Sequence, residues 1–477
     1  MFLIIFGRAA QFVLLLAMMR VATSFLPPEE MGRMSLITTS TAFFALFLVN
    51  PVGMFINRRL HAWDTKGLVR RYLDFYWFYL LLVGMAAAAG LLLVNRLGVI
   101  GFQTSTIWLV VLVCGSLLFN TVNQTVIPSL NLLGFRGWFI VLTLATIVTG
   151  FLLALILIMR LQPKAEYWLL GLLIGQLVFA GIGGKIFFGK LHPSQVATYK
   201  PTRTHIKVLF GFAWPVAISV GLSWFQTQGY RFLMENSLGL APLGLFVAGY
   251  GISIGMVAAF ESVLTTYFQP LFYKRVSTGD REEHSRAWNY YASAILPSLL
   301  LLVFFIAAVA PELTRLLLGP AYQSASQFVV WGAVAEAARV AVGTYGMVAH
   351  AKMKTKLLLV PNLVGAVLSI TLILWLVPEY GPAGAGIALT LAGVAVVVAM
   401  HRFMRSELVI TLPYKFLIRS LGLGVLLIGV ATAGRLMTGE SESLMVAVLL
   451  LAVVGASFLP IQYWLLRPFL SRHGEVV

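Results

Sequence analysis

Fourteen apolar stretches, each long enough to cross a lipid bilayer, run through this chain of 477 residues. A transmembrane helix needs about 20 mostly apolar residues, whereas a membrane β-barrel shows short segments of alternating polarity. Only 11% of the residues are charged, too few to cover the surface of a soluble protein of this length. The sequence therefore predicts an all-α, polytopic membrane protein with 14 transmembrane helices. The predicted spans are residues 2–25, 35–57, 73–94, 104–127, 138–159, 167–189, 207–230, 241–268, 288–310, 325–349, 355–377, 383–402, 413–434 and 443–466.

The Lys and Arg residues alternate between the two sides of these spans. Of the 34, 24 fall in even-numbered loops and the C-terminal tail, 7 in odd-numbered loops, and 3 within spans. Cytoplasmic loops are rich in Lys and Arg, so both termini are predicted to be cytoplasmic. The net charge of +17 then reflects topology and contact with anionic lipids, and no nucleic-acid partner is expected. No cleavable signal peptide is expected, since the first span carries two arginines and leads into further spans.

A turn recurs in the two halves of the sequence. Residues 25–33 and 237–246 both place a leucine, a short gap, a proline and then a glycine at the opening of a span. The repeat predicts two six-helix lobes around a central cavity, plus two extra C-terminal helices. We expect an N-terminal lobe at 1–189, a cytoplasmic linker at 190–206, a C-terminal lobe at 207–402, and two additional helices with a short tail at 403–477. Transporters built from repeats place their substrate between the repeats.

The three cations within spans are Arg8, Arg20 and Arg339. A charged side chain at a helix centre costs about 2.5–3.5 kcal/mol even on cautious scales, so such residues mark functional sites by default. Arginine suits phosphate because its planar fork donates two parallel hydrogen bonds. These residues are the predicted contacts for an anionic substrate, arranged as a ladder across the membrane. Arg8 and Arg20 could instead extend to the nearer interface.

Two carboxylates also lie within spans. Glu336 precedes Arg339 by three residues on the same helix face, which is compatible with a neutralising pair or with a proton-operated switch that releases the arginine. Glu261 is placed in the cytoplasmic half of the span 241–268. Both carboxylates are candidates for ion coupling. Asn50 and Pro51 interrupt the second span and are expected to free a backbone carbonyl there.

Aromatic and amide side chains within spans are further candidates for substrate contact. An interfacial aromatic belt or an ordinary helix end is the alternative interpretation. The candidates are Gln11, Asn120, Gln124, Trp224, Gln226 and Gln228.

Catalytic and cofactor motifs do not occur in the sequence. There is no phosphate-binding P-loop, no dinucleotide-binding glycine fingerprint and no zinc-binding pair of histidines on a helix. The single cysteine, Cys114, excludes an internal disulfide. We therefore expect no metal, no cofactor and no enzymatic activity, and the short outer loops disfavour a glycan polymerase or ligase.

Three stretches carry a family resemblance: Gly7–Gln11 with the following turn, Leu317–Tyr322, and Leu376–Ala388. They resemble the Wzx-type oligosaccharide flippases of the multidrug/oligosaccharidyl-lipid/polysaccharide exporter superfamily. The resemblance implies a V-shaped, two-lobed, alternating-access transporter. It would move a polyprenyl-pyrophosphate-linked oligosaccharide across the bacterial inner membrane for surface or exopolysaccharide synthesis. The three arginines within spans would then be the predicted pyrophosphate contacts, and the aromatic and amide candidates the predicted contacts for sugar rings and hydroxyls.

The resemblance also implies partners. These are the lipid-linked oligosaccharide, membrane lipids, a polysaccharide polymerase and other biosynthesis proteins. Two alternatives stay open: a lipid II flippase of peptidoglycan synthesis, and a multidrug or cation antiporter of the same superfamily.

Overall fold

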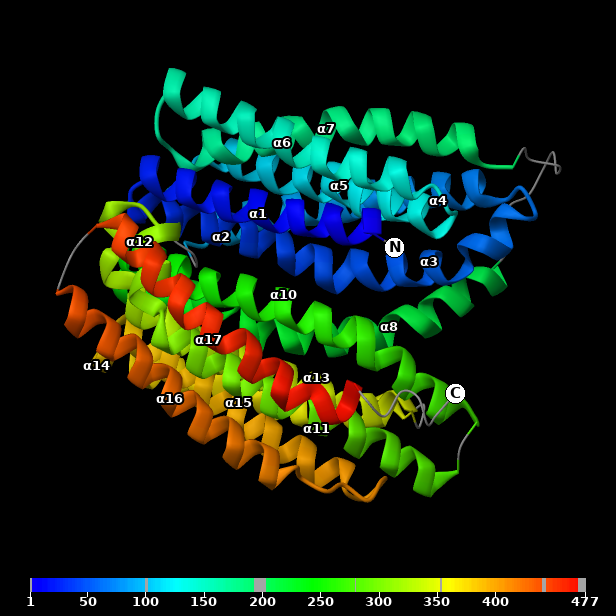
Figure 1. Cartoon of the computed structure of the whole chain (residues 1–477). Helices are drawn as coiled ribbons and strands as arrows, with labels where there is room; N and C mark the ends of the chain where they lie inside the picture. The colour runs from blue at the N-terminus through cyan, green and yellow to red at the C-terminus, as the bar shows by residue number, and fades with distance from the viewer. Residues whose placement is uncertain are drawn as a thin grey trace. The chain divides into compact units, whose positions relative to one another are not determined.

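The computed structural model describes residues 2–98, 102–192, 203–278, 280–351, 354–439 and 443–470. Within these ranges the chain is almost entirely helical and contains no strand (Figure 1). This confirms the predicted all-α class. The chain folds into two compact units, Met1–Gly244 and Leu245–Val477.

The first unit contains nine α-helices, one π-helical turn and the start of a tenth α-helix. They are α1 (Phe2–Phe25), α2 (Pro28–Phe44), η1 (Ala45–Val49), α3 (Asn50–Asp64), α4 (Val69–Arg96), α5 (Thr106–Leu132), α6 (Arg136–Arg160), α7 (Ala165–Lys190), α8 (Arg203–Thr227), α9 (Tyr230–Leu238) and the start of α10 (Leu240–Thr278).

The second unit contains the rest of α10 and the helices that follow it. They are α11 (Arg281–Ala308), α12 (Ala310–Leu317), η2 (Pro320–Ala325), α13 (Ser326–Ala351), η3 (Thr355–Leu358), α14 (Leu359–Tyr380), α15 (Pro382–Met404), α16 (Tyr414–Thr438) and α17 (Leu444–Leu470).

Twelve helical segments in the described chain are long and apolar enough to cross a membrane, and a shorter apolar helix covers Ala9–Phe25. The predicted count of fourteen is not confirmed. The two predicted spans outside the twelve correspond to α1 and α13, and α13 carries Glu336 and Arg339 near its middle. The twelve apolar helices support a multi-pass membrane protein, as the sequence predicts.

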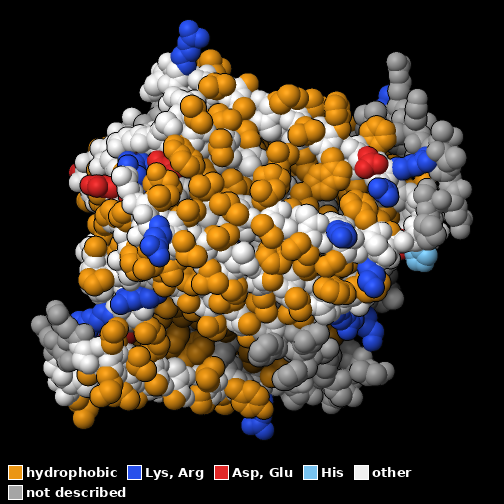
Figure 2. Space-filling model, turned by 90° about the horizontal axis from the view of Figure 1, so that it is seen from above, with side chains coloured by type: hydrophobic (Ala, Val, Ile, Leu, Met, Phe, Trp, Pro, Cys, Tyr) orange, Lys and Arg blue, Asp and Glu red, His pale blue; other side chains and the backbone are white. Residues whose placement is uncertain are grey.

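Large apolar side chains cover the outside of the helices. Leu436 is 80% exposed, Ile107 78% and Trp375 67%. Figure 2 shows hydrophobic side chains spread across the face that it draws. Because lipid tails solvate such groups as well as a protein core does, this surface fits the hydrocarbon of a bilayer.

The division into units differs from the predicted lobe boundary. Helix α8 packs on α3 and η1, with Phe212 5.8 Å from Phe55 between ring centroids and Trp224 5.0 Å from Phe43. The predicted span 207–230 therefore belongs to the first compact unit. Most of the predicted linker, residues 193–202, lies outside the described chain. The predicted functional lobes stay a prediction.

The two repeated turns meet at their glycines. A Cβ on Gly32 would overlap the carbonyl oxygen of Leu240, and a Cβ on Gly244 would overlap the carbonyl oxygen of Pro28. The first turns of α2 and α10 therefore cross in backbone contact, and each repeat contributes the glycine that the other requires. The repeat seen in the sequence is thus a packing motif.

Asn50 and Pro51 do not break the second span. The chain passes through the π-helical turn η1 and continues as α3. The Leu48 carbonyl oxygen in this turn accepts a hydrogen bond of 2.8 Å from the Tyr79 hydroxyl. A side chain from α4 thus satisfies a carbonyl inside the membrane span, as backbone groups in hydrocarbon require.

Glycines also set the contact between α6 and α7, which lie side by side (Figure 1). A Cβ on Gly171 would overlap the backbone of Ala154, and a Cβ on Gly175 would lie 2.6 Å from Gly150 Cα. Small residues spaced by four allow membrane helices to approach this closely.

We predict that Gly171→Ala separates α6 from α7 and lowers stability by about 1–3 kcal/mol, the usual cost of overpacking. The matched control is Gly181→Ala in the same helix, where an added Cβ meets nothing within 4 Å. Thermal unfolding of the purified protein in detergent measures both. Equal melting temperatures for the two variants would contradict this account of the α6–α7 contact.

Candidate functional site

A network of charged side chains lies in the second unit and is centred on Arg339. The Arg339 Nε donates to Glu336 Oε2 at 2.6 Å, and its Nη2 donates to Glu261 Oε2 at 2.8 Å. The Tyr250 hydroxyl donates to the other oxygen of Glu336 at 3.2 Å. One guanidinium therefore binds two carboxylates, one from its own helix and one from α10.

The network lies near the middle of its helices. At about 1.5 Å per residue, Glu336 and Arg339 are roughly 15 Å from the nearer end of α13. Glu261 is also close to the middle of α10, because this helix continues to Thr278. The predicted place of Glu261 in the cytoplasmic half of the span 241–268 stays a prediction, while the helix itself continues ten residues beyond that span.

Close packing of α10 against α13 builds the network. A Cβ on Gly332 would lie 3.1 Å from Tyr250 Cα, and a Cβ on Gly249 would overlap the carbonyl oxygen of Ala325. The Ser253 hydroxyl donates to the Val329 carbonyl at 2.5 Å. The two backbones thus approach closely enough for Tyr250 to reach Glu336.

Exposure differs across the network. The Glu336 side chain is 7% exposed, the Glu261 side chain 27% and the Arg339 side chain 39%. Glu336 is therefore enclosed, while the guanidinium is bound on one side and open on the other. With all three groups ionised the formal charge is −1, so one proton would make the network neutral.

The arginines of the first span lie in the other unit. Arg20 is half-buried in α1, while the side chain of Arg8 lies outside what the structure describes. Gln11, predicted to share the face of Arg8, is half-buried. Arg339 belongs to the second unit, and the predicted ladder stays a prediction.

Of the predicted sugar contacts in and just after α8, Trp224 is packed into an aromatic cluster. Trp224 is 6% exposed and lies 5.0 Å from the rings of both Phe43 and Phe225. Its Nε1 and the Gln228 Oε1 are buried and have no hydrogen-bond partner among the described residues. Gln226 is half-buried. Unsatisfied buried polar atoms are costly, so Trp224 and Gln228 each offer one group to a ligand or water.

The predicted sugar contacts on α5 differ from one another. Asn120 is half-buried and Gln124 is exposed. Between them in sequence, Asn123 is buried and donates to the Gln176 carbonyl on α7 at 2.9 Å. Asn123 thus serves the α5–α7 contact, and Gln124 is the more accessible amide.

Other paired charges were not predicted from the sequence. Glu30 binds Arg33 and accepts a hydrogen bond of 2.7 Å from the backbone N–H of Ala165, the first residue of α7. Arg435 on α16 binds Glu312 on α12, with Nη2 2.7 Å from Oε2. These pairs join helix ends. In the sequence, these residues are recognisable only as charged residues next to predicted spans.

Tyr250 was also missed, because a tyrosine in an apolar helix resembles any other aromatic core residue. No group of three or more His, Cys, Asp or Glu residues in the described chain is arranged to hold a metal ion.

Several solved transporter structures share this fold. The lipid II flippase MurJ, in an inward closed conformation, superposes with a TM-score of 0.67 at 14% identity, covering 98% of this chain and all of that chain. An inward-facing multidrug resistance MATE family transporter of the MOP superfamily gives 0.61 at 16% identity, covering 83% of this chain and 94% of that chain. A MOP superfamily transporter from Pyrococcus furiosus gives 0.59 at 15% identity, with 84% and 93% covered.

No curated protein matches the chain in sequence. A family profile described as polysaccharide biosynthesis protein matches residues 21–327. This match covers more than half of the chain, and the all-helical membrane fold agrees with it. The chain belongs to the polysaccharide biosynthesis protein family.

Proposed function

We propose that this protein is a flippase that moves a polyprenyl-pyrophosphate-linked oligosaccharide across the bacterial inner membrane by alternating access. The observation that carries the proposal is the Arg339 network, an arginine held by two carboxylates in the middle of apolar helices of a protein from a polysaccharide biosynthesis family. Charges in membrane spans are costly and persist where they bind an ion or a charged substrate.

The chemistry of the network suits a pyrophosphate. A guanidinium donates paired hydrogen bonds to phosphate oxygens, and Arg339 retains an open side. In the resting network the two carboxylates compete with an anionic ligand for this arginine. A proton on either carboxylate removes one competitor and neutralises the site, so proton binding and pyrophosphate binding favour each other. Such linkage is reciprocal by thermodynamic necessity.

The remaining assignments rest on this function. Arg8 and Arg20 are proposed as further pyrophosphate contacts, and Glu261 and Glu336 as the coupling groups. The amides and Trp224 are proposed as glycan contacts after the aromatic cluster opens. Both termini are proposed to be cytoplasmic, the predicted lobes to move as units, and a polysaccharide polymerase to receive the product. The protein is proposed to act without enzymatic chemistry.

A lipid II flippase is the second candidate. The MurJ structure is covered over its whole length and covers nearly all of this chain, whereas the MATE structures cover about five-sixths of it. The family match favours the oligosaccharide carrier. A multidrug antiporter is less favoured, because the family profile that matches the chain is described as a polysaccharide biosynthesis protein. Complementation of two bacterial strains, one lacking a polysaccharide flippase and one depleted of its lipid II flippase, separates the first two candidates.

We predict that Arg339→Gln lowers transport about 10- to 100-fold. This factor corresponds to the free energy of one charge-assisted hydrogen bond to phosphate. Surface polysaccharide in the complemented strain, normalised to the amount of protein in the membrane, is the readout. The single change leaves the Glu336 carboxylate buried without its cation, which can destabilise the protein by itself. The double variant Arg339→Gln/Glu336→Gln removes one positive and one negative charge together, so it tests the loss of Arg339 without that unpaired carboxylate.

Arg435→Gln is the control for breaking an ion pair elsewhere. It removes a similar arginine–carboxylate pair in the same unit and outside the network. We expect it to lower stability and to leave transport per folded molecule close to wild type. Normal polysaccharide output from both Arg339 variants would remove Arg339 from the mechanism.

We predict that Glu336→Gln weakens the pH dependence of pyrophosphate binding and leaves only the part that Glu261 contributes. Glutamine mimics the protonated carboxyl, so the variant should bind at neutral pH as tightly as the wild type does at lower pH. Titration of the purified protein with a short-chain polyprenyl pyrophosphate measures this. Glu312→Gln, at the carboxylate paired with Arg435, is the matched control and should keep the wild-type pH profile. A pH profile shared by wild type and Glu336→Gln would exclude Glu336 as the coupling group.

A further inference from the structure

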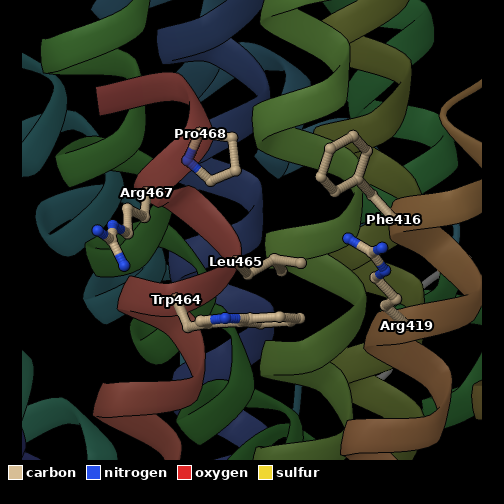
Figure 3. A pocket seen from close by; sticks show the side chains of 6 residues that line it. All are labelled: Phe416, Arg419, Trp464, Leu465, Arg467 and Pro468. Carbon is tan, nitrogen blue, oxygen red and sulfur yellow. The ribbon is translucent and has the colours of Figure 1, made fainter. Parts of the chain in front are cut away.

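A small cavity opens between the beginning of α16 and the end of α17 (Figure 3). It encloses about 130 Å³, several times the roughly 30 Å³ that one water molecule occupies in the liquid. Helix α16 contributes two of its lining side chains and α17 the other four. The lining residues are Phe416, Arg419, Trp464, Leu465, Arg467 and Pro468.

Arg419 is the centre of this cavity. Its guanidinium carbon lies 5.9 Å from the centroid of the Phe416 ring and 5.8 Å from that of Trp464. Figure 3 shows the Arg419 guanidinium directed into the space between the two helices, with the Trp464 ring extending towards it. Cation–π contacts of this kind hold an arginine in position without consuming its hydrogen-bond donors.

Among the described residues, no acidic side chain pairs with Arg419. Neither α16 nor α17 contains an Asp or Glu. Within the described chain no ion pair involves Arg419 or Arg467. This contrasts with Arg339 and Arg435, each of which binds a carboxylate. The cavity is therefore a site of net positive charge with free donors.

The surroundings of the cavity are those of a membrane interface. Exposed apolar and aromatic side chains flank it, with Ile418 69% exposed, Leu459 67% and Tyr463 63%. Arg419 lies five residues into α16, or roughly 7–8 Å from its start at 1.5 Å per residue. Arginine with tryptophan and tyrosine at the ends of spans is typical of the headgroup region of the bilayer.

We propose that this cavity binds the phosphate of an anionic membrane phospholipid. Arg419 donates to the phosphate oxygens, Phe416 and Trp464 hold the guanidinium, and the acyl chains follow the exposed apolar surface beside α17. Arg467 lines the same cavity but is directed to the other side of α17 in Figure 3, so it contributes mainly long-range charge. A soluble phosphate offers the same oxygens but gains nothing from the apolar rim.

The proposed lipid site is independent of the proposed transport. It lies on helices that share no residue with the Arg339 network, and its readout is lipid binding. Loss of transport in an Arg339 variant leaves the lipid site intact, and failure of the lipid site leaves the flippase proposal intact.

Native mass spectrometry of the full-length purified protein tests the proposal. Three additions are compared at equal concentration: phosphatidylglycerol, phosphatidylcholine and inorganic phosphate. We expect preferential retention of phosphatidylglycerol, and about a five-fold loss of that retention in Arg419→Gln, since one basic group near a membrane surface contributes about that factor. Because Arg419 is exposed, the variant should keep the wild-type melting temperature in detergent without added lipid.

Three further variants make the test specific. Arg402→Gln removes an exposed arginine from the last turn of α15 and should retain phosphatidylglycerol like the wild type. Trp464→Leu should weaken retention by releasing the guanidinium, and Arg467→Gln should have a smaller effect than Arg419→Gln. Equal loss in Arg402→Gln and Arg419→Gln would overturn the proposal, since it would show general charge attraction. Displacement of the lipid by equimolar inorganic phosphate would also overturn it.

Discussion

The requirement that every backbone polar group be satisfied away from water governs this structure. In hydrocarbon only a helix satisfies its own N–H and C=O groups, so a chain with this density of apolar spans becomes a bundle of helices. In the π-helical turn η1, the Tyr79 hydroxyl of a neighbouring helix donates an additional hydrogen bond to the Leu48 carbonyl. The same requirement applies to side chains, and within the described chain the carboxylates of the Arg339 network and the Arg435 pair are bound to arginine.

Glycine determines how closely these helices pack. Apolar side chains are solvated equally well by lipid and by protein, so they do not by themselves bring two membrane helices together. Backbone contact at Gly171 and Gly175 joins α6 to α7, and Gly249 and Gly332 join α10 to α13. The second contact has a chemical consequence, because it places Tyr250 and Glu261 where they reach the charges of α13.

The charge network and the cavity at α16 and α17 use arginine in opposite ways. Arg339 is bound by two carboxylates, so the proposed anionic ligand would compete with them, and the proposed proton would remove one competitor. Arg419 is held by aromatic rings and keeps its donors, so an anion can bind without displacing a partner. The arginine held by carboxylates therefore suits a switch, and the arginine held by aromatic rings suits continuous binding of an anion.

The amino-acid sequence by itself determined the helical class, the membrane location, the approximate positions of the spans and the pairing of Glu336 with Arg339. These follow from local properties: the length of an apolar run, and the spacing of two residues on one helix. Only the tertiary structure decided that Glu261 and Tyr250 join that pair, that Trp224 is enclosed by phenylalanines, and that the two repeated glycines cross at α2 and α10. Such contacts join residues far apart in the chain, and they depend on which helix faces meet, which no local spacing specifies.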